Sequence, residues 1–373
     1  NGQKVAKTHM ENGIDQTEQQ LNEKLFALEE GGPTALGPAV VSAIAMAGEC
    51  GNGSSVVICT DGLANIGVGC LEEQKEGDVD VATFYEQLAA YAYEKGVTVH
   101  IISIKGEECD LETLTPLYDK TGGNVEIIEP DELMTNFANM FKKEIIATKV
   151  LTKIKLHKAL EFRNEDPEDL NEDRTMLTRD IGNVTEDSEI TFEYRVKNKE
   201  DLDKLKDFDI NKLEIIPFQT IIEYTKLDGM KCIRTLTQVQ KVTDNAEAAR
   251  EKANIELLAV NAAQQASKIA RKGNFREAQA YSVLNKKYIK SNLKTSEQKA
   301  AYSGWKKQMN EVYDGMHYQN NMEEMVNEQM VEEQLDEAPK SSKKGFFSKL
   351  GDKLSKNIQK ANRFTSNDLK KKE

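Results

Sequence analysis

The stretch Val56–Gly69, VVICTDGLANIGVG, constrains the fold more than any other part of the sequence. It opens with a short apolar run and continues into a glycine-containing loop that begins at Asp61. A continuous apolar run bounded by turn residues is typical of a strand buried on both faces of a parallel sheet. Asp61 would then lie at the carboxyl end of this strand, the edge where open α/β sheets bind ligands.

Outward from this stretch, predicted strands and helices alternate. Strands are predicted over residues 55–60, 97–104 and 124–128, and helices over residues 17–30, 38–47, 78–95, 111–119 and 130–146. This alternation predicts a parallel sheet that is covered by helices on both faces. We therefore expect residues 1–147 to form a Rossmann-like α/β domain.

Two loops carry candidate metal ligands for the carboxyl edge of this sheet. Thr34 lies in the run GGPTALGP, residues 31–38, directly before a predicted helix, and Asp61 follows the predicted strand. Hydroxyl and carboxylate oxygens are hard ligands that suit Mg²⁺ or Mn²⁺. Each residue also has a purely structural interpretation, Thr34 as a helix N-cap and Asp61-Gly62 as a turn.

In combination these motifs resemble the von Willebrand factor A (vWA) family. That family's metal-ion-dependent adhesion site uses an Asp-x-Ser-x-Ser loop, a distant Thr and a distant Asp. The resemblance implies that Thr34 and Asp61 are the second and third of these elements. The Asp-x-Ser-x-Ser pattern is absent from the sequence. Because it belongs to the family's first strand, the domain is expected to lack its first strands, and Mg²⁺ or Mn²⁺ to bind only where that loop is supplied.

A longer stretch narrows this resemblance. Residues 84–109, FYEQLAAYAYEKGVTVHIISIKGEEC, look like the vWA region of circularly permuted Ras-like proteins. The order of the later segments is similar to the trunk, β-sandwich and helical domains of inner COPII coat subunits, with GMKCIRTLT at residues 229–237 as the matching local feature.

The later segments predict two further domains and a tail. Strands are predicted over residues 150–157, 175–179, 189–196, 213–216, 220–225 and 231–238, and helices over residues 244–271, 275–289, 296–312 and 322–335. We expect an antiparallel β-sandwich over residues 148–243 and a helical domain over residues 244–335. Residues 336–373 are expected to form a linker and a basic tail.

The charge distribution and the motif search exclude several classes of protein. The chain carries a net charge of −13, and its acidic body does not favour a nucleic-acid partner. Five cysteines without CxxC spacing do not suggest a disulfide framework or a zinc site. GxSxG, HExxH and GxxxxGK[ST] motifs are absent, so we expect no enzyme. We interpret His100 as a core residue and Cys59 as an inert buried thiol.

The carboxy-terminal stretch over residues 345–364 is basic and amphipathic. Its apolar residues recur at helical spacing among lysines: Phe346, Phe347, Leu350, Leu354, Ile358 and Ala361. Such a stretch suits a membrane surface or an acidic groove of a partner protein. Packing on the chain's own acidic body is a further interpretation.

Together these features predict an intracellular scaffold or adaptor in the cytoplasm, with the cytoskeleton or the cilium as further locations. Its protein partners are expected at the carboxyl edge of the vWA sheet, with or without a bridging Mg²⁺ or Mn²⁺. A structural subunit of a large coat, cytoskeletal or ciliary assembly is an alternative. A third interpretation is the effector part of a GTPase-containing regulatory protein.

Overall fold

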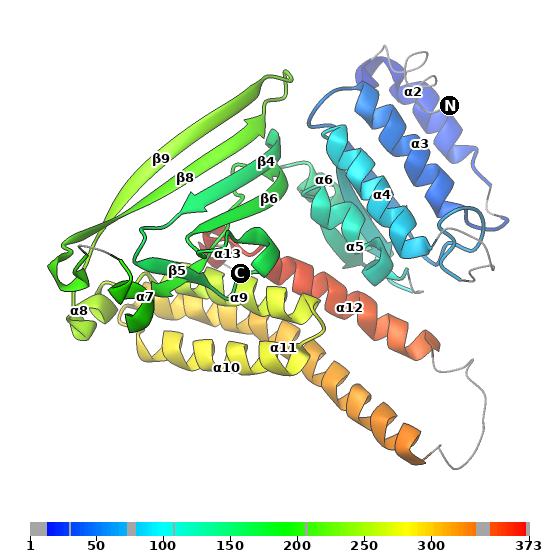
Figure 1. The fold of residues 1–373 in the computed structure, drawn as a ribbon. Coiled ribbons are helices and arrows are strands. Elements are labelled where there is room, and N and C mark those ends of the chain that lie inside the picture. Colours follow the sequence, from blue (N-terminus) through cyan, green and yellow to red (C-terminus); the bar gives the residue numbers. More distant parts are fainter. Residues whose placement is uncertain are drawn as a thin grey trace.

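The computed structural model describes residues 13–29, 31–72, 80–106, 109–205, 208–332 and 344–370. The predicted linker falls largely outside these ranges, as do residues 1–12 of the first domain. The described chain contains a parallel sheet with helices, two antiparallel sheets, and a group of long helices (Figure 1).

The parallel sheet contains strands β1 (Ser55–Thr60), β2 (Thr98–Ile104) and β3 (Val125–Ile128), in the order β1-β2-β3. Both neighbouring pairs are parallel, as the alternating pattern predicted. The helices of this part are α2 (Ile14–Phe26), α3 (Leu36–Glu49), α4 (Val81–Glu94), α5 (Leu111–Lys120) and α6 (Leu133–Met140). The short 3₁₀ turn η1 (Pro130–Glu132) precedes α6.

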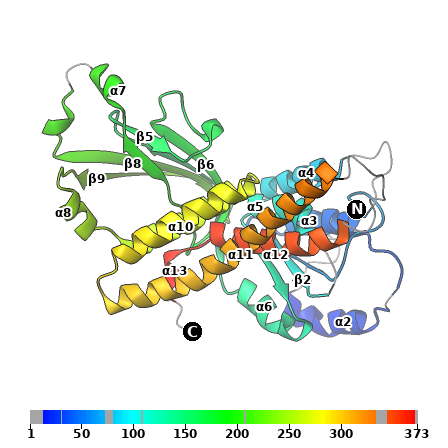
Figure 2. The ribbon, with the colours of Figure 1, turned by 90° about the horizontal axis from the view of Figure 1, so that it is seen from below.

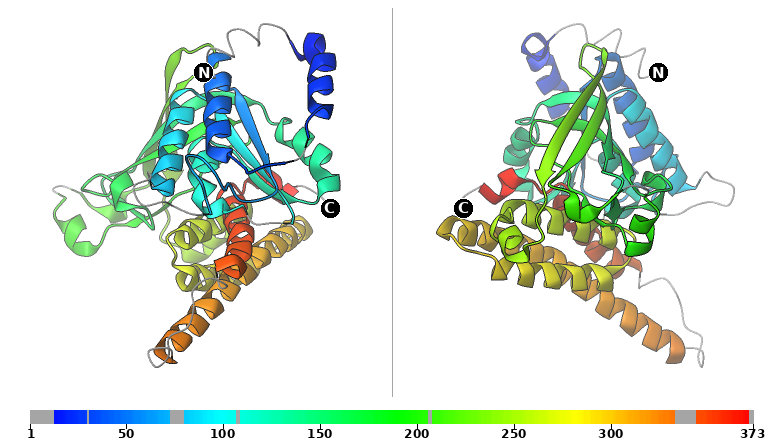
Figure 3. Two further views of the ribbon diagram at one scale, coloured as in Figure 1. Left: turned by 90° about the vertical axis from the view of Figure 1, so that its right-hand side faces the viewer. Right: turned by 60° about the vertical axis from the view of Figure 1, so that its left-hand side comes forward.

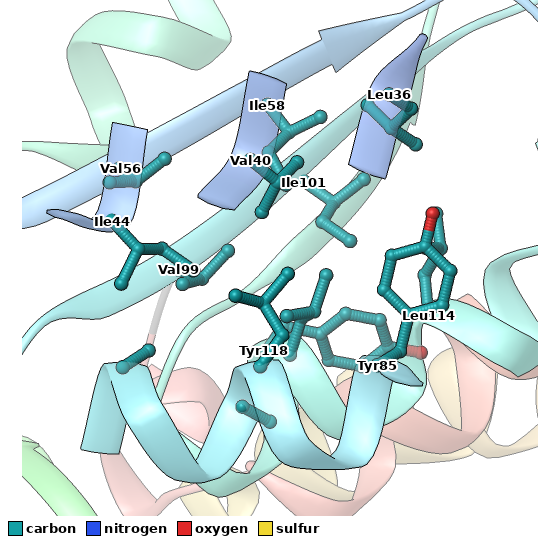
Figure 4. Packing of buried hydrophobic residues seen from close by; sticks show 14 of the residues in the cluster. Leu36, Val40, Ile44, Val56, Ile58, Tyr85, Val99, Ile101, Leu114 and Tyr118 are labelled. Atoms are coloured by element: carbon teal, nitrogen blue, oxygen red, sulfur yellow. The ribbon is translucent and has the colours of Figure 1, made fainter. Parts of the chain in front are cut away.

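The main core of this part lies on one face of the sheet (Figure 4). Side chains from β1 and β2 meet those of three helices there: Val56, Ile58, Val99 and Ile101 from the strands, Leu36, Val40 and Ile44 from α3, Tyr85 from α4, and Leu114 and Tyr118 from α5. A smaller cluster of Ile102, Ile128 and Met140 covers part of the other face.

The two longer strands differ in burial, which corrects one expectation. The first six residues of β2 are buried, as a central parallel strand requires. In β1, by contrast, Val57 is only half-buried and Cys59 is exposed. The interpretation of Cys59 as a buried core thiol is therefore wrong, because β1 is at the edge of the described sheet and only one of its faces is well covered.

The second part contains a four-stranded antiparallel sheet in the order β6-β4-β8-β9 and a two-stranded sheet β5-β7. Their bounds are β4 (Ile145–Lys155), β5 (Leu160–Arg163), β6 (Met176–Thr185), β7 (Glu193–Val196), β8 (Ile215–Thr225) and β9 (Lys231–Lys241). The short helical turns are η2 (Pro167–Asp169), α7 (Lys199–Asp203) and η3 (Ile210–Lys212). The two sheets share one core that includes Ile154, Phe162, Leu177 and Ile216.

Two predicted segments of this region have different bounds in the structure. The helix predicted over residues 130–146 ends at Met140, because Ile145 already pairs with Thr185 in the antiparallel sheet. The two strands predicted over residues 213–225 are one strand, β8, which continues through Pro217 with its register to β9 unbroken.

The third part is helical: α8 (Ala246–Glu251), α9 (Ile255–Arg271), α10 (Phe275–Ser291), α11 (Ser296–Glu332), α12 (Lys344–Asn362) and α13 (Ser366–Lys370). The single helix predicted from residue 244 to 271 is divided, because the Asn254 side chain caps α9 by accepting from the Leu257 N–H at 3.1 Å. The two helices predicted within residues 296–335 are one continuous helix, α11.

Helix α12 packs between the first and third parts, as the view from below shows (Figure 2). Its buried residues Leu354, Ile358 and Ala361 join a cluster with residues of α9, α10 and α11. Of the three interpretations of this segment, its described side chains follow the one in which the apolar face packs on the chain's own body. No described helix combines the length and apolar character needed to cross a bilayer.

Candidate functional site at the carboxyl edge of the parallel sheet

The carboxyl ends of β1, β2 and β3 lie along one edge because the three strands are parallel. Asp61 follows the last residue of β1 and is exposed. Thr60, directly before it, is buried, and its hydroxyl donates to the Gly62 carbonyl at 2.9 Å. The strand end therefore presents the Asp61 carboxylate outward from a locally fixed turn.

Thr34, on the segment directly before α3, is hydrogen-bonded to the same loop. Its carbonyl accepts from the N–H groups of Asn65 and Ile66, at 3.0 and 3.3 Å. Its own N–H donates to Asn65 Oδ1 at 2.6 Å. Three hydrogen bonds thus tie the Thr34 segment to the loop that begins at Asp61.

Close packing fixes the remainder of this loop. A Cβ added at Gly37, near the start of α3, would lie 1.9 Å from the Val68 carbonyl oxygen, so only glycine permits this approach. The hydroxyl of the buried Tyr85, on α4, donates to the Gly69 carbonyl at 2.8 Å. The Leu71 N–H closes the loop on the Ala64 carbonyl at 2.7 Å. The loop is therefore held in place by α3, α4 and the Thr34 segment.

The side chains of the two predicted ligands are both exposed, and the loop contacts bring their segments together. Within the described ranges, no group of three or more His, Cys, Asp and Glu side chains is placed to hold a metal ion. A site of the predicted kind also takes hydroxyl oxygens and an Asp-x-Ser-x-Ser loop, so its metal binding stays a prediction.

A carboxylate from α12 also lies at this edge of the sheet. The buried Asp352 accepts from the N–H groups of Cys109 and Leu111, at 3.0 and 2.7 Å. Leu111 begins α5, so Asp352 supplies negative charge to the amino end of that helix, where the helix dipole favours it. The contact joins residues more than 240 positions apart in the sequence.

The Cys109 thiol beneath this contact is buried and unsuited to nucleophilic chemistry. It lies 3.3 Å from the Ser103 hydroxyl, and it donates weakly to the Thr60 carbonyl at 3.8 Å. Burial raises the pKa of the thiol, and the negative charges of Asp352 and Asp61 raise it further. A protonated thiol in this place is a packing residue.

A cleft of about 920 Å³ lies next to this edge, between α5, α12 and the helices of the third part. Its lining includes Leu63 and Leu71 from the loop after β1, Asp110 and Glu112 from the start of α5, and Asp352 and Ser355 from α12. The loop with Asp61 and the cleft are therefore continuous parts of one surface.

An ion-pair network holds the two sides of the cleft together. Arg271 of α9 makes two hydrogen bonds to the Asp119 carboxylate of α5, at 2.7 and 3.0 Å, and also bonds to Gln359 of α12. Arg363 donates to the Gly122 carbonyl at 2.6 Å. Burial alone would raise the pKa of Asp119, but the Arg271 guanidinium outweighs it, and the pKa lies below its usual value.

The sequence did not indicate the role of Asp352. Its only signal is that Gly351-Asp352 interrupts a run of lysines with the single acidic residue between positions 340 and 367. By contrast, the structure confirms the interpretation of His100 as a core residue. His100 is 7% exposed, and its Nδ1 accepts from the Asn124 N–H at 3.1 Å.

Comparisons with known proteins identify a relative by sequence and a solved structure of similar fold. No protein-family model matches this chain. The chain is 33% identical over 278 residues to a protein of Dictyostelium discoideum named Circularly permutated Ras protein 1. The match takes in 74% of this chain and 31% of that protein, so the chain spans about a third of the relative's length.

Among solved structures, the human COPII-coat protein Sec24c superposes with a TM-score of 0.56. The match covers 96% of this chain and 47% of that chain at 11% identity, so it shows a shared fold. This chain is therefore homologous to part of a circularly permutated Ras protein, and all three of its parts are arranged as in a portion of a coat subunit.

Proposed function

We propose that this chain is a protein-binding scaffold whose binding surface is the carboxyl edge of the β1-β2-β3 sheet, with the adjoining cleft. The observation that carries the proposal is the exposed Asp61, presented on a loop that Thr34, Gly37 and Tyr85 hold in place. A rigid loop with an outward carboxylate suits recognition, because little conformational freedom is lost when a partner binds.

The shared fold with a COPII coat protein supports a scaffold-like role for the whole chain. Helix α12 contacts both the α/β part and the helical part, so the edge belongs to one packed body. The neutral Cys109 thiol offers no nucleophile at the edge, which favours binding over catalysis. A cytoplasmic location is part of the same proposal.

Within this proposal the α/β part is a vWA domain, and Thr34 and Asp61 hold a Mg²⁺ or Mn²⁺ ion where an Asp-x-Ser-x-Ser loop completes the site. The ion would supply an open coordination position for a carboxylate of the partner protein. The oxygens of Thr34 and Asp61 are of the type that these ions prefer.

Site-specific photo-crosslinking in cells tests the proposed surface. A photoreactive amino acid replaces Ile66, which is 44% exposed in the loop after β1, or as a control Ile233, which is 68% exposed on β9. We expect discrete protein adducts from position 66, and their loss when Asp61→Ala is added. The same adducts at both positions, or adducts indifferent to Asp61→Ala, would contradict the proposal.

A second candidate function is the effector part of a GTPase-containing protein, which the similarity to a circularly permutated Ras protein favours. This role uses the same scaffold but couples it to a nucleotide-binding domain in the same polypeptide. It predicts that nucleotide exchange in the complete protein changes the crosslinking yield at position 66. A yield independent of the bound nucleotide would argue for the scaffold alone.

A further inference from the structure

A basic groove lies between α10 and α11, far along the chain from the site at the sheet edge. It has a volume of about 460 Å³. Four lysines line it: Lys286, Lys287, Lys290 and Lys306. Aromatic and apolar side chains line the remainder: Val283, Tyr302, Trp305, Met309 and Tyr313. An apolar lining with basic side chains suits an amphipathic acidic segment.

The positive charge of this groove is not balanced within the described residues. None of its four lysines makes an ion pair there, although Lys286 Nζ donates to Asn310 Oδ1 at 2.9 Å. In a chain with a net charge of −13, such a cluster is unusual. It provides electrostatic complementarity for an acidic binding partner.

Trp305 forms a fixed wall of this groove. Its side chain is 1% exposed, lines the groove, and packs in a core cluster with residues of α9 and with Met309. An apolar wall that the core holds in place suits the apolar side of an amphipathic segment.

The same helix carries a segment with the required chemistry. Residues 323–332, EEMVNEQMVE, contain four glutamates, no lysine or arginine, and four apolar residues. Glu324, Glu328 and Glu332 recur at four-residue spacing in the sequence. This half of α11 extends past the rest of the molecule (Figures 1 and 3).

This acidic segment cannot reach the groove of its own chain, because both lie along one continuous helix. We therefore propose that the groove binds the acidic half of α11 from a second copy of this chain. Two α11 helices that cross antiparallel near Tyr318 place each acidic half against the other copy's groove. The contact is then made twice around a two-fold axis, as in most closed dimers.

Sedimentation velocity of residues 1–373, from about 1 to about 100 µM, tests this proposal. We expect a monomer–dimer equilibrium that weakens from about 50 to about 500 mM NaCl, because salt screens exposed charges. The variant Lys287→Glu/Lys290→Glu should weaken dimerisation about tenfold or more, and Glu324→Lys/Glu328→Lys should do the same. Lys299→Glu is the matched control, since Lys299 is exposed on α11 outside the groove.

Mixing the two double variants gives the decisive result. Each forms a weak homodimer, but both contacts in their mixed dimer pair opposite charges, so the mixture should dimerise as well as the wild type. This recovery also shows that both variants are folded. A wild type that stays monomeric across the range, a dimer indifferent to both double variants, or a mixture that does not recover would each overturn the proposal.

Discussion

At the scale of single residues, burial determines the protonation state of His100, a side chain that ordinarily titrates near neutral pH. His100 lies in the central strand β2, and its pKa is lowered to about 4, first by burial and then by the positive charge of Arg363. Its ring is therefore neutral in the folded protein at physiological pH. The unfolded chain, by contrast, protonates near the ordinary value of about 6.5.

This difference predicts a pH-dependent stability. Between pH 6.5 and about 4 the unfolded state binds the His100 proton and the folded state does not, so the free energy of unfolding falls as the pH falls. His100→Gln keeps a hydrogen-bond acceptor for Asn124 and should remove about 2.5 kcal/mol of the change in unfolding free energy between pH 7 and pH 4.5. Urea denaturation at pH 7 and pH 4.5 measures it. An equal loss of unfolding free energy between these two pH values in variant and wild type would show that His100 is not the cause.

Asp61 is the residue on which the metal proposal depends. In a form of the chain that carries an Asp-x-Ser-x-Ser strand at its amino end, saturating Mn²⁺ should stabilise the fold by about 2.7 kcal/mol at a hundredfold excess over Kd. Asp61→Ala should abolish this gain and leave the metal-free melting temperature nearly unchanged, because the side chain is exposed. The same Mn²⁺-induced shift in variant and parent would exclude Asp61 as a ligand.

At the scale of elements, helix α3 sets the position of the candidate site through one close approach. This helix contains two glycines, Gly37 and Gly48, whose replacement by alanine can be compared directly. Gly37→Ala would place a methyl group against the Val68 carbonyl, whereas Gly48→Ala meets only the flexible Lys95 side chain, at 3.1 Å or more. Only the first of these contacts involves backbone of the loop after β1.

We expect Gly37→Ala to lower the free energy of unfolding by about 1–3 kcal/mol, because the helix and loop must separate. Gly48→Ala should be neutral or stabilise by about 0.5–1 kcal/mol, since alanine favours the helix. Chemical denaturation compares the two, and crosslinking from position 66 should fall only in Gly37→Ala. Similar stabilities for both variants would show that the approach to Val68 does not constrain the loop.

Some elements could be predicted from the sequence and others could not. Periodicity located β1, β2, α4 and α5 closely, because a parallel sheet between helices imposes a strong local pattern. Thr34 and Asp61 could be assigned to the same edge of the sheet from the sequence. Asp61 follows a predicted strand, and Thr34 precedes the helix that leads into that strand. The location of α12 could not be predicted. Its basic, amphipathic pattern fits a membrane, a partner or its own chain equally, and the choice depends on contacts such as Asp352 with Leu111, 241 positions apart.

At the scale of the whole molecule, α12 joins the α/β part to the helical part. One side of it contributes Leu354 and Ile358 to the helical cluster. Its polar residues bond to the α/β part: Asp352 to Cys109 and Leu111, Lys356 to the Ile127 carbonyl and Glu126, and Arg363 to the Gly122 carbonyl. A scaffold that presents the sheet edge rigidly depends on this connection.

The most direct test of this central claim compares two probes of unfolding in one urea titration. Trp305, the single tryptophan, reports the helical part by fluorescence, and circular dichroism reports the whole chain. We expect the two probes to give coincident midpoints for the wild type and for the control Lys353→Ala/Lys360→Ala, whose lysines are exposed. For Asp352→Ala/Lys356→Ala/Arg363→Ala we expect separate midpoints. Separate midpoints in the wild type, or coincident midpoints in the triple variant, would contradict this claim.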